Sequence, residues 1–271
     1  MDVVRRVVVV TGGASGIGRA LCRSFAAAGA RATVVADIDG EGARAVAAEL
    51  RGRGAGSLAV TTDVADAEQV ADLVAVAEAD FGPVDIFCAN AGILVTGGTD
   101  LAPATWDRAW SVNVMSHVHA AHAVLPSMLE RGEGYLVHTA SAAGLLTQLG
   151  AAPYSVTKHA VVALAEWLSI THGEAGIRVS CVCPQGVWTA MTGSIDDTTP
   201  GVAQATAGRD GMVEPEAVAE AVLEAVAAER FLVLPHPEVA TYEQRRAGDR
   251  ERWLRSMRRV QAQIADLGQP T

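Results

Sequence analysis

Tyr154 and Lys158 are the residues of this chain whose types and spacing most directly suggest chemistry. They begin and end the stretch "YSVTK", and Lys158 is the one lysine among 21 basic side chains, so the remaining 20 are arginines. Residues four apart on a helix lie on the same face. An ammonium about 4.5 Å from a phenol would favour the phenolate by roughly 3 to 4 kcal/mol at an effective dielectric of about 20. The pair predicts a phenol that exchanges a proton with an alcohol; the alternative is an ordinary surface pair on an amphipathic helix.

A glycine-rich stretch near the start of the chain suggests a second partner for this chemistry. In "VVVVTGGASGIGRAL", Gly12, Gly16 and Gly18 follow an apolar run and open a helix. Glycines there let the backbone approach a pyrophosphate, and the helix N-terminus offers free N–H groups. Asp37 stands 19 residues after Gly18, at the end of the next apolar run. A carboxylate there binds ribose hydroxyls and repels a 2′-phosphate, so we expect NAD rather than NADP; a glycine turn with Asp37 as a helix cap is the alternative.

The elements that must position these residues are indicated by hydrophobic periodicity. Short β-branched runs alternate with longer alanine-rich helical stretches, which is typical of a parallel sheet buried on both faces. The runs lie at 7–10, 33–36, 58–61, 84–89, 135–139, 178–183 and 231–234. The pattern predicts an α/β fold with a single Rossmann-type, doubly wound parallel sheet of about seven strands and a C-terminal helical extension.

Two regions interrupt this alternation. Residues 190–213 are rich in Gly, Thr and Asp, and their length favours a substrate lid loop over a plain connection. We therefore expect a dinucleotide-binding catalytic domain over 1–236 and a helical extension over 237–271. The apolar stripe of that extension is formed by Trp253, Met257, Val260 and Ile264. This stripe must pack against the chain itself or a neighbouring subunit.

Composition excludes several classes of function. The net charge is −10 and half of the residues are hydrophobic, so nothing draws the whole chain to nucleic acid or to anionic lipid. The apolar run at 7–10 is too short for a signal peptide or a membrane span. We expect a cytoplasmic protein that acts on a small molecule, with no nucleic-acid or membrane partner.

Cysteines and histidines give no sign of a metal site. The cysteines (Cys22, Cys88, Cys181 and Cys183) lack paired ligand spacing and resemble small buried apolar residues. Three histidines, His117, His119 and His122, cluster on one predicted helix without an accompanying carboxylate. We expect them to be structural or interfacial, and we expect no metal.

Several motifs in order resemble those of the short-chain dehydrogenase/reductase family. They are "TGGASGIG" at 11–18, "NAG" at 90–92, Asn113, Ser141 and "YSVTK". The resemblance covers residues 5 to about 235. It implies that Ser141 orients the substrate, that Tyr154 transfers the proton, that Lys158 assists it and holds the nicotinamide ribose, and that Asn113 holds a water near the lysine.

The resemblance also implies a set of nucleotide contacts. These are Gly12, Ser15, Gly16, Ile17, Gly18, Asp37, Asp63, Val64, Asn90, Ala91, Gly92, Tyr154, Lys158, Pro184, Val187 and Thr189. One position departs from the family pattern, because "PQGVWT" has Gln185 where the family usually has glycine. That difference bears on the substrate side of the pocket.

The expected substrate is a medium-sized, mainly apolar secondary alcohol or ketone. Its contacts are predicted at Ser141, Leu146, Tyr154, Trp188 and Met191, and the family resemblance implies a homotetramer or homodimer. Two other functions remain open. One is an epimerase or dehydratase of the extended branch, which shares the Tyr-x-x-x-Lys motif; the other is a non-catalytic, NAD-binding redox sensor.

Overall fold

The sheet of seven parallel strands sits at the centre of the molecule. The structure is a computed structural model, and it describes residues 1–193 and 211–267. The sheet has the order β3-β2-β1-β4-β5-β6-β9, and every neighbouring pair is parallel. Its strands are β1 (Val7–Thr11), β2 (Ala32–Asp37), β3 (Gly56–Thr61), β4 (Ile86–Ala89), β5 (Gly134–Thr139), β6 (Ile177–Val182) and β9 (Leu232–Val233). The predicted doubly wound fold is confirmed.

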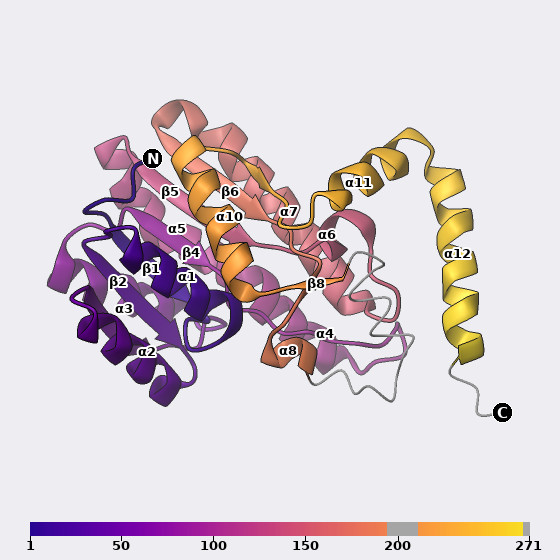
Figure 1. Cartoon of the computed structure of the whole chain (residues 1–271), viewed down its shortest axis with the longest axis horizontal. Coiled ribbons are helices and arrows are strands. Elements are labelled where there is room, and N and C mark those ends of the chain that lie inside the picture. Colours follow the sequence, from indigo (N-terminus) through magenta and orange to yellow (C-terminus); the bar gives the residue numbers. More distant parts are fainter. Residues whose placement is uncertain (194–210, 268–271) are drawn as a thin grey trace.

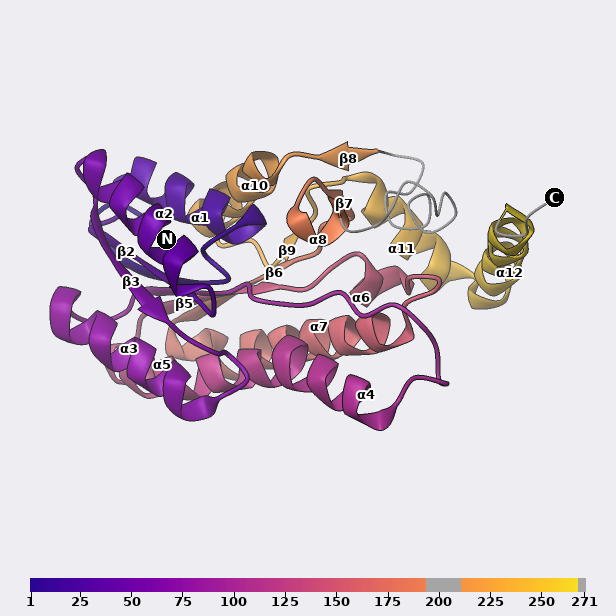
Figure 2. The same ribbon diagram turned by 90° about the horizontal axis from the view of Figure 1, so that it is seen from below.

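Helices cover both faces of the sheet (Figure 2). One face carries α1 (Gly16–Ala27), α2 (Gly40–Gly52) and α10 (Pro215–Ala228), and the other carries α3 (Ala67–Phe81), α5 (Ser116–Arg131) and α7 (Ala152–His172). Because both faces are covered, the central strands are buried: all residues of β1 and β5 are buried, whereas the edge strand β3 is mostly half-buried. The α7 helix begins with proline near its first turn, where the missing N–H costs nothing.

Shorter elements lie along the carboxyl edge of the sheet. They are α4 (Pro103–Trp110), a π-helical turn (Ser111–Met115), α6 (Ala143–Leu146), β7 (Gly186–Val187), α8 (Ala190–Gly193) and β8 (Met212–Val213), which pairs with β7. The predicted lid spans 190–213, and its part from 194 to 210 lies outside the described residues.

The C-terminal extension consists of α11 (Glu238–Gly248) and α12 (Arg250–Leu267). Figure 1 shows α12 standing away from the body of the molecule at its C-terminal end. Its apolar side chains are only partly covered, and Leu254 and Val260 are 40% and 39% exposed. Within the described part of the chain, no helix combines the length and apolar character that crossing a bilayer requires.

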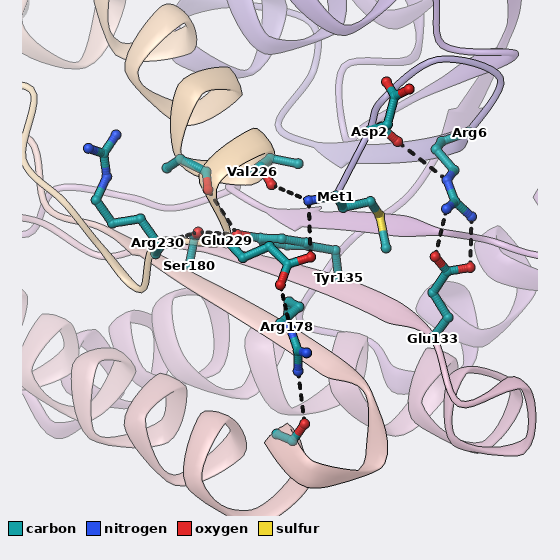
Figure 3. Close-up of polar contacts among 12 residues, drawn as sticks. Met1, Asp2, Arg6, Glu133, Tyr135, Arg178, Ser180, Val226, Glu229 and Arg230 are labelled. Carbon is teal, nitrogen blue, oxygen red and sulfur yellow. Dashed lines mark hydrogen bonds and ion pairs between the residues drawn. The ribbon is translucent and has the colours of Figure 1, made fainter.

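The amino ends of the strands are joined by ion pairs (Figure 3). Arg6, just before β1, pairs with both oxygens of Glu133 at 2.9 and 2.6 Å and with Asp85 at 3.3 Å. Asp85 and Glu133 immediately precede β4 and β5, so one guanidinium links three adjacent strands. Nearby, Arg178 binds Glu229 at 2.7 Å, which joins β6 to the end of α10.

Candidate active site

A cleft of about 310 Å³ opens at the carboxyl edge of the sheet. This is where ligands bind in open parallel sheets, because the loops that follow the strands diverge there. Every residue predicted to contact a nucleotide lines this cleft. Three of the residues predicted to contact substrate, Ser141, Tyr154 and Met191, line it as well. The structure therefore brings together segments that are more than 170 residues apart in the sequence, from Gly12 to Thr189.

The glycine loop forms the nucleotide end of the cleft from bare backbone. Gly12 and Gly16 have φ angles of +67° and +49°, in the left-handed region that favours glycine. A Cβ on Gly18 would collide with the carbonyl oxygen of Gly12, and a Cβ on Gly16 would come within 3.0 Å of Thr189. Ser15 takes the N-cap position of α1 in an extended conformation, so the free N–H groups of that helix face the loop.

Asp37 binds the glycine loop directly. Its Oδ2 accepts a hydrogen bond from the Ala14 N–H at 3.0 Å, and its Oδ1 accepts one from the Asp39 N–H at 3.0 Å. These bonds hold the carboxylate at the end of β2, beside the helix N-terminus and on the wall of the cleft. Asp63 and Val64 line the cleft next to it, and Asp63 lies 3.8 Å from a guanidinium nitrogen of Arg108.

Asn90 joins three strand ends beneath the cleft. Its Nδ2 donates to the Thr11 carbonyl at 3.0 Å, and its Oδ1 accepts from the Thr139 hydroxyl at 3.1 Å. The Thr11 hydroxyl in turn accepts from the N–H groups of Asn90 and Ala91 at 3.0 and 3.2 Å. These bonds fix the ends of β1, β4 and β5 relative to one another.

Ser141 and Tyr154 form the reactive end of the cleft. Ser141 follows β5 and is 6% exposed, and its hydroxyl accepts from the Ala143 N–H at 3.1 Å and donates to the Pro184 carbonyl at 3.4 Å. Burial raises the pKa of Tyr154, whereas a hydrogen bond with the Ser141 hydroxyl lowers it. The lowering of the Tyr154 pKa that we expected from Lys158 is not seen. The ammonium lies 5.7 Å from the centroid of the ring. Burial of the phenol is the largest influence on the Tyr154 pKa, and it raises that pKa.

Lys158 is a buried ammonium behind Tyr154. It is 3% exposed, and its Nζ donates to the Thr139 carbonyl at 2.8 Å. Burial lowers its pKa to about 8, because the charged form loses hydration. A Cβ on Gly92 would come within 3.4 Å of Nζ, so the glycine of "NAG" leaves the ammonium its space.

Asn113 acts from behind the cleft and does not line it. It lies in the π-helical turn and is fully buried. Its Oδ1 accepts from the Ile93 N–H at 2.8 Å, while its Nδ2 donates to the Ile93 carbonyl at 2.9 Å and to the Thr157 hydroxyl at 3.2 Å. The side chain thus ties the "NAG" loop to the residue beside Lys158. Thr157 was not predicted, although it lies within "YSVTK".

Two residues predicted to contact substrate lie elsewhere. Leu146 lines a second cavity, and Trp188 is 57% exposed while its N–H donates to the Val213 carbonyl at 3.0 Å. The substrate end of the cleft instead includes Gln148 and Gln185. The departure from the family pattern at Gln185 indicates this side of the pocket, whereas nothing in the sequence indicates Gln148. The Gln185 N–H donates to Nδ1 of the buried His236 at 3.2 Å.

Two histidines are buried behind the lysine. The Nδ1 atoms of His117 and His138 lie 2.9 Å apart, so one ring donates to the other. Burial lowers the pKa of His138 to about 4 and that of His117 well below its usual range, and the pair is neutral. Cys181 in β6 and Cys183 just after its end are also buried, with 3.8 Å between their sulfurs. Among the described residues, no group of His, Cys, Asp or Glu could hold a metal ion.

Comparisons with known proteins agree with this geometry. Residues 6–200 match the family described as short chain dehydrogenase. The chain is 40% identical to 1-deoxy-11-beta-hydroxypentalenate dehydrogenase of Streptomyces exfoliatus, over 88% of this chain and 86% of that protein. It is 36% identical to cis-4-hydroxycyclohexanecarboxylate dehydrogenase of Sinomonas cyclohexanicum, over 80% and 87%.

A solved structure shows the same architecture. It is a short chain dehydrogenase/reductase from Burkholderia phymatum in complex with NAD, with a TM-score of 0.85 and 31% sequence identity, covering 93% of this chain and 96% of that one. The matched family spans the glycine loop and the reactive residues described above, and it extends through most of the sheet. The chain therefore belongs to the short chain dehydrogenase family of oxidoreductases.

Proposed function

We propose that this protein is an NAD-dependent dehydrogenase that interconverts a secondary alcohol and a ketone on a medium-sized, mainly apolar molecule. The observation that carries the proposal is the convergence of Ser141, Tyr154 and Lys158 on one cleft whose other end is a glycine loop facing Asp37. These side chains supply an orienting hydroxyl, a proton-transferring phenol and a cation, and a nucleotide would supply the redox chemistry that they lack.

The residues of the cleft fit a dinucleotide. The backbone at Gly12, Gly16, Gly18 and Gly92 leaves space that a Cβ would fill or crowd. Asp37 is placed to accept hydrogen bonds from ribose hydroxyls and to repel a 2′-phosphate, which favours NAD over NADP. The nicotinamide end would rest against Pro184, Val187 and Thr189, and the Lys158 ammonium would hold the nearby ribose. When bound, this group accepts or donates the hydride.

The side chains divide the proton chemistry among them. In alcohol oxidation, the Ser141 hydroxyl binds the substrate oxygen and Tyr154 takes its proton. In ketone reduction, Tyr154 returns that proton to the same oxygen. Lys158 favours the phenolate, which accepts the proton in oxidation and forms in reduction, because its positive ammonium is held near the ring by the Thr139 carbonyl. Asn113 helps to position Lys158 through its hydrogen bond with the adjacent Thr157, on the side away from the cleft.

The substrate class follows from the reactive end of the cleft and from the relatives. Ile93, Leu94 and Met191 give this end an apolar lining, while Gln148 and Gln185 add amides. Two relatives are named for hydroxyl-bearing carboxylates built on carbon rings, a pentalenate and a cyclohexanecarboxylate. We therefore place an alicyclic hydroxy acid or its ketone first among candidate substrates.

The proposal includes the organisation of the protein. Residues 1–236 form the catalytic domain and 237–271 form a helical extension, in a cytoplasmic homodimer or homotetramer. Large apolar side chains exposed on α4 and α7 support assembly, since isolated monomers rarely expose so many on neighbouring helices. They are Trp110, Val156, Trp167 and Ile170.

Turnover of secondary alcohols and ketones with NAD(H) and NADP(H) in parallel tests the proposal. We expect NAD-linked turnover of at least one alicyclic hydroxy acid, with a loss of about a hundredfold or more in Tyr154→Phe. Tyr135→Phe is the matched control, because that hydroxyl bonds Ser180 at 2.8 Å in the core and faces no substrate. Turnover that survives in Tyr154→Phe contradicts the mechanism, and NAD binding without turnover of any substrate would support a redox sensor.

A further inference from the structure

A second cavity of about 370 Å³ lies beside the reaction cleft. The segment 146–149 separates the two: Gln148 lines the cleft, whereas its neighbours Thr147 and Leu149 line the second cavity. The opposite wall is formed by α11 and α12, the helices that stand at the C-terminal end of the molecule (Figure 1). Most of the lining surface is apolar, and the apolar side chains that line it are Leu146, Leu149, Trp253, Leu254 and Met257.

Three arginines complete this wall. Arg246, Arg250 and Arg258 line the second cavity. Within residues 1–193 and 211–267, none of the three has a carboxylate within ion-pair distance. The pKa of Arg246 is lowered by burial and by the charge of Arg250, while the charge of Glu243 acts in the opposite direction. In the part of the chain that the structure describes, three guanidiniums without an ion-pair partner thus border a mainly apolar cavity.

The cluster is connected to the catalytic helix. A guanidinium N–H of Arg246 donates to Nε2 of His159 at 3.3 Å, and Nδ1–H of the same ring donates to the Ser155 carbonyl at 2.8 Å. The Ser155 hydroxyl accepts from the Gln148 N–H at 2.8 Å. Ser155 is adjacent to Tyr154 in α7, so an anion bound at Arg246 would lie two hydrogen bonds away from the reactive end of the cleft.

We propose that the second cavity is a binding site for an apolar organic acid, with its carboxylate held by Arg246 and Arg250 and its carbon body packed against Leu149 and Trp253. Arginine suits this task because its planar fork pairs with both carboxylate oxygens. The mainly apolar lining requires a ligand that is itself apolar beyond its charge. The acid is either the far end of a hydroxy-acid substrate, an assignment that rests on the proposed function, or a separate ligand.

Binding of octanoate to the whole protein tests the site without requiring turnover. Isothermal titration calorimetry and Trp253 fluorescence should both detect octanoate, with octanamide binding about tenfold more weakly because it lacks the charge. Arg246→Gln/Arg250→Gln should weaken octanoate binding by about tenfold or more. Arg252→Gln/Arg255→Gln is the matched control, since it removes the same charge from exposed positions of α12 that do not line the cavity. Arg250→Gln alone tests the site while keeping the Arg246–His159 bond.

Kinetics with a substrate found under the proposed function separate the two sources of the acid. If the substrate's own carboxylate binds there, Arg246→Gln/Arg250→Gln raises KM for the hydroxy acid about tenfold and leaves KM for its neutral amide unchanged, and octanoate competes with the substrate. If the acid is a separate ligand, octanoate changes turnover without competing. Equal binding of octanoate and octanamide, or no loss in the double variant, overturns the proposal. The proposal is also overturned if octanoate does not bind. One such case is a dimer, detected by sedimentation, in which α12 of each copy occupies this cavity.

Discussion

The Nζ of Lys158 donates a hydrogen bond to the carbonyl oxygen of Thr139 at 2.8 Å. This bond joins the first turns of α7 to the end of β5, and Ser141 follows two residues beyond Thr139. The helix that carries Tyr154 and the loop that carries Ser141 therefore meet through a buried ammonium. Because the acceptor is a backbone carbonyl, the hydrogen bond depends little on the side chain at residue 139. Residue 158 must instead supply a compact donor.

Replacing Lys158 by arginine should impair the enzyme although the charge is retained. The guanidinium is larger and planar, and the space beside Gly92 accommodates a compact ammonium. We expect Lys158→Arg to lose about tenfold or more in both NAD affinity and kcat, measured by titration and steady-state kinetics. Arg53→Lys, the reverse exchange at an exposed position, is the control and should leave both unchanged. Activity close to that of the unaltered protein in Lys158→Arg would show that the ammonium's geometry is irrelevant.

The direction of catalysis should depend on pH through Tyr154. Because burial raises the pKa of this phenol, it is protonated at neutral pH and available as an acid. We expect kcat/KM for ketone reduction to fall, and that for alcohol oxidation to rise, as the pH increases from about 6 to about 10. Measuring both directions with one substrate pair checks this expectation. Profiles that move together would assign the proton transfer to another group.

Asp37 should determine the choice of nucleotide. Its carboxylate is fixed by the Ala14 and Asp39 N–H groups at the wall of the cleft. Removing the charge in Asp37→Ala should increase kcat/KM for NADP relative to NAD by about tenfold or more, because a 2′-phosphate is no longer repelled. Asp39→Asn is a suitable control: it removes a charge two residues away, where the carboxylate caps α2 by accepting from the Gly42 N–H at 3.0 Å. An unchanged ratio in Asp37→Ala would contradict the role of this residue.

A single methyl group at Gly18 should strongly weaken nucleotide binding. The added Cβ meets the Gly12 carbonyl oxygen, so the loop must move away from its present course. We expect Gly18→Ala to bind NAD at least about a hundredfold more weakly in calorimetric titration, since the N–H groups of the loop no longer face the phosphates. Gly52→Ala adds the same group at the end of α2, where nothing lies within 4 Å, and should bind NAD normally.

The buried histidine pair should make the protein sensitive to mild acid. The folded-state pKa values of His117 and His138 lie below the unfolded value of about 6.5. The unfolded chain therefore binds more protons, and the free energy of unfolding should decrease as the pH falls from about 6.5 toward about 4, by up to about 1.4 kcal/mol per pH unit for each histidine. Urea unfolding at several pH values measures this slope. Replacing the exposed His122 by Gln should leave this slope unchanged. If the free energy of unfolding of the unsubstituted protein does not depend on pH in this range, the pair is not neutral.

The fold could be predicted because the central strands are buried on both faces and are therefore mainly apolar. The runs beginning at Val7 and at Arg178 correspond within one or two residues to β1 and β6. The grouping of the glycines and Asp37 at one cleft could be predicted because these residues have strict conformational and charge requirements in a nucleotide site. Their presence along one cleft follows from the parallel order of the strands.

Other features depend on tertiary contacts that leave no pattern in a single sequence. Leu146 belongs to the second cavity because α12 stands over its segment, and nothing in its neighbours indicates this. The π-helical turn around Asn113 depends on bonds to Ile93 and Thr157, which are distant in the sequence. The Tyr154 pKa was expected to be lowered because the spacing of the tyrosine and lysine was visible, whereas the burial of the phenol was not.

The ion pairs in Figure 3 lie at the opposite edge of the sheet from the chemistry. Arg6 binds residues that precede β4 and β5, whereas Ser141 and Asn90 follow those same strands. The ion pairs that stabilise the sheet therefore lie at the amino ends of these strands, and the residues that line the cleft lie at their carboxyl ends. An engineer or natural selection can accept destabilising substitutions around the cleft and compensate for them at the amino edge, where new contacts do not touch the substrate. This separation makes the protein a tolerant starting point for changing the alcohol on which it acts.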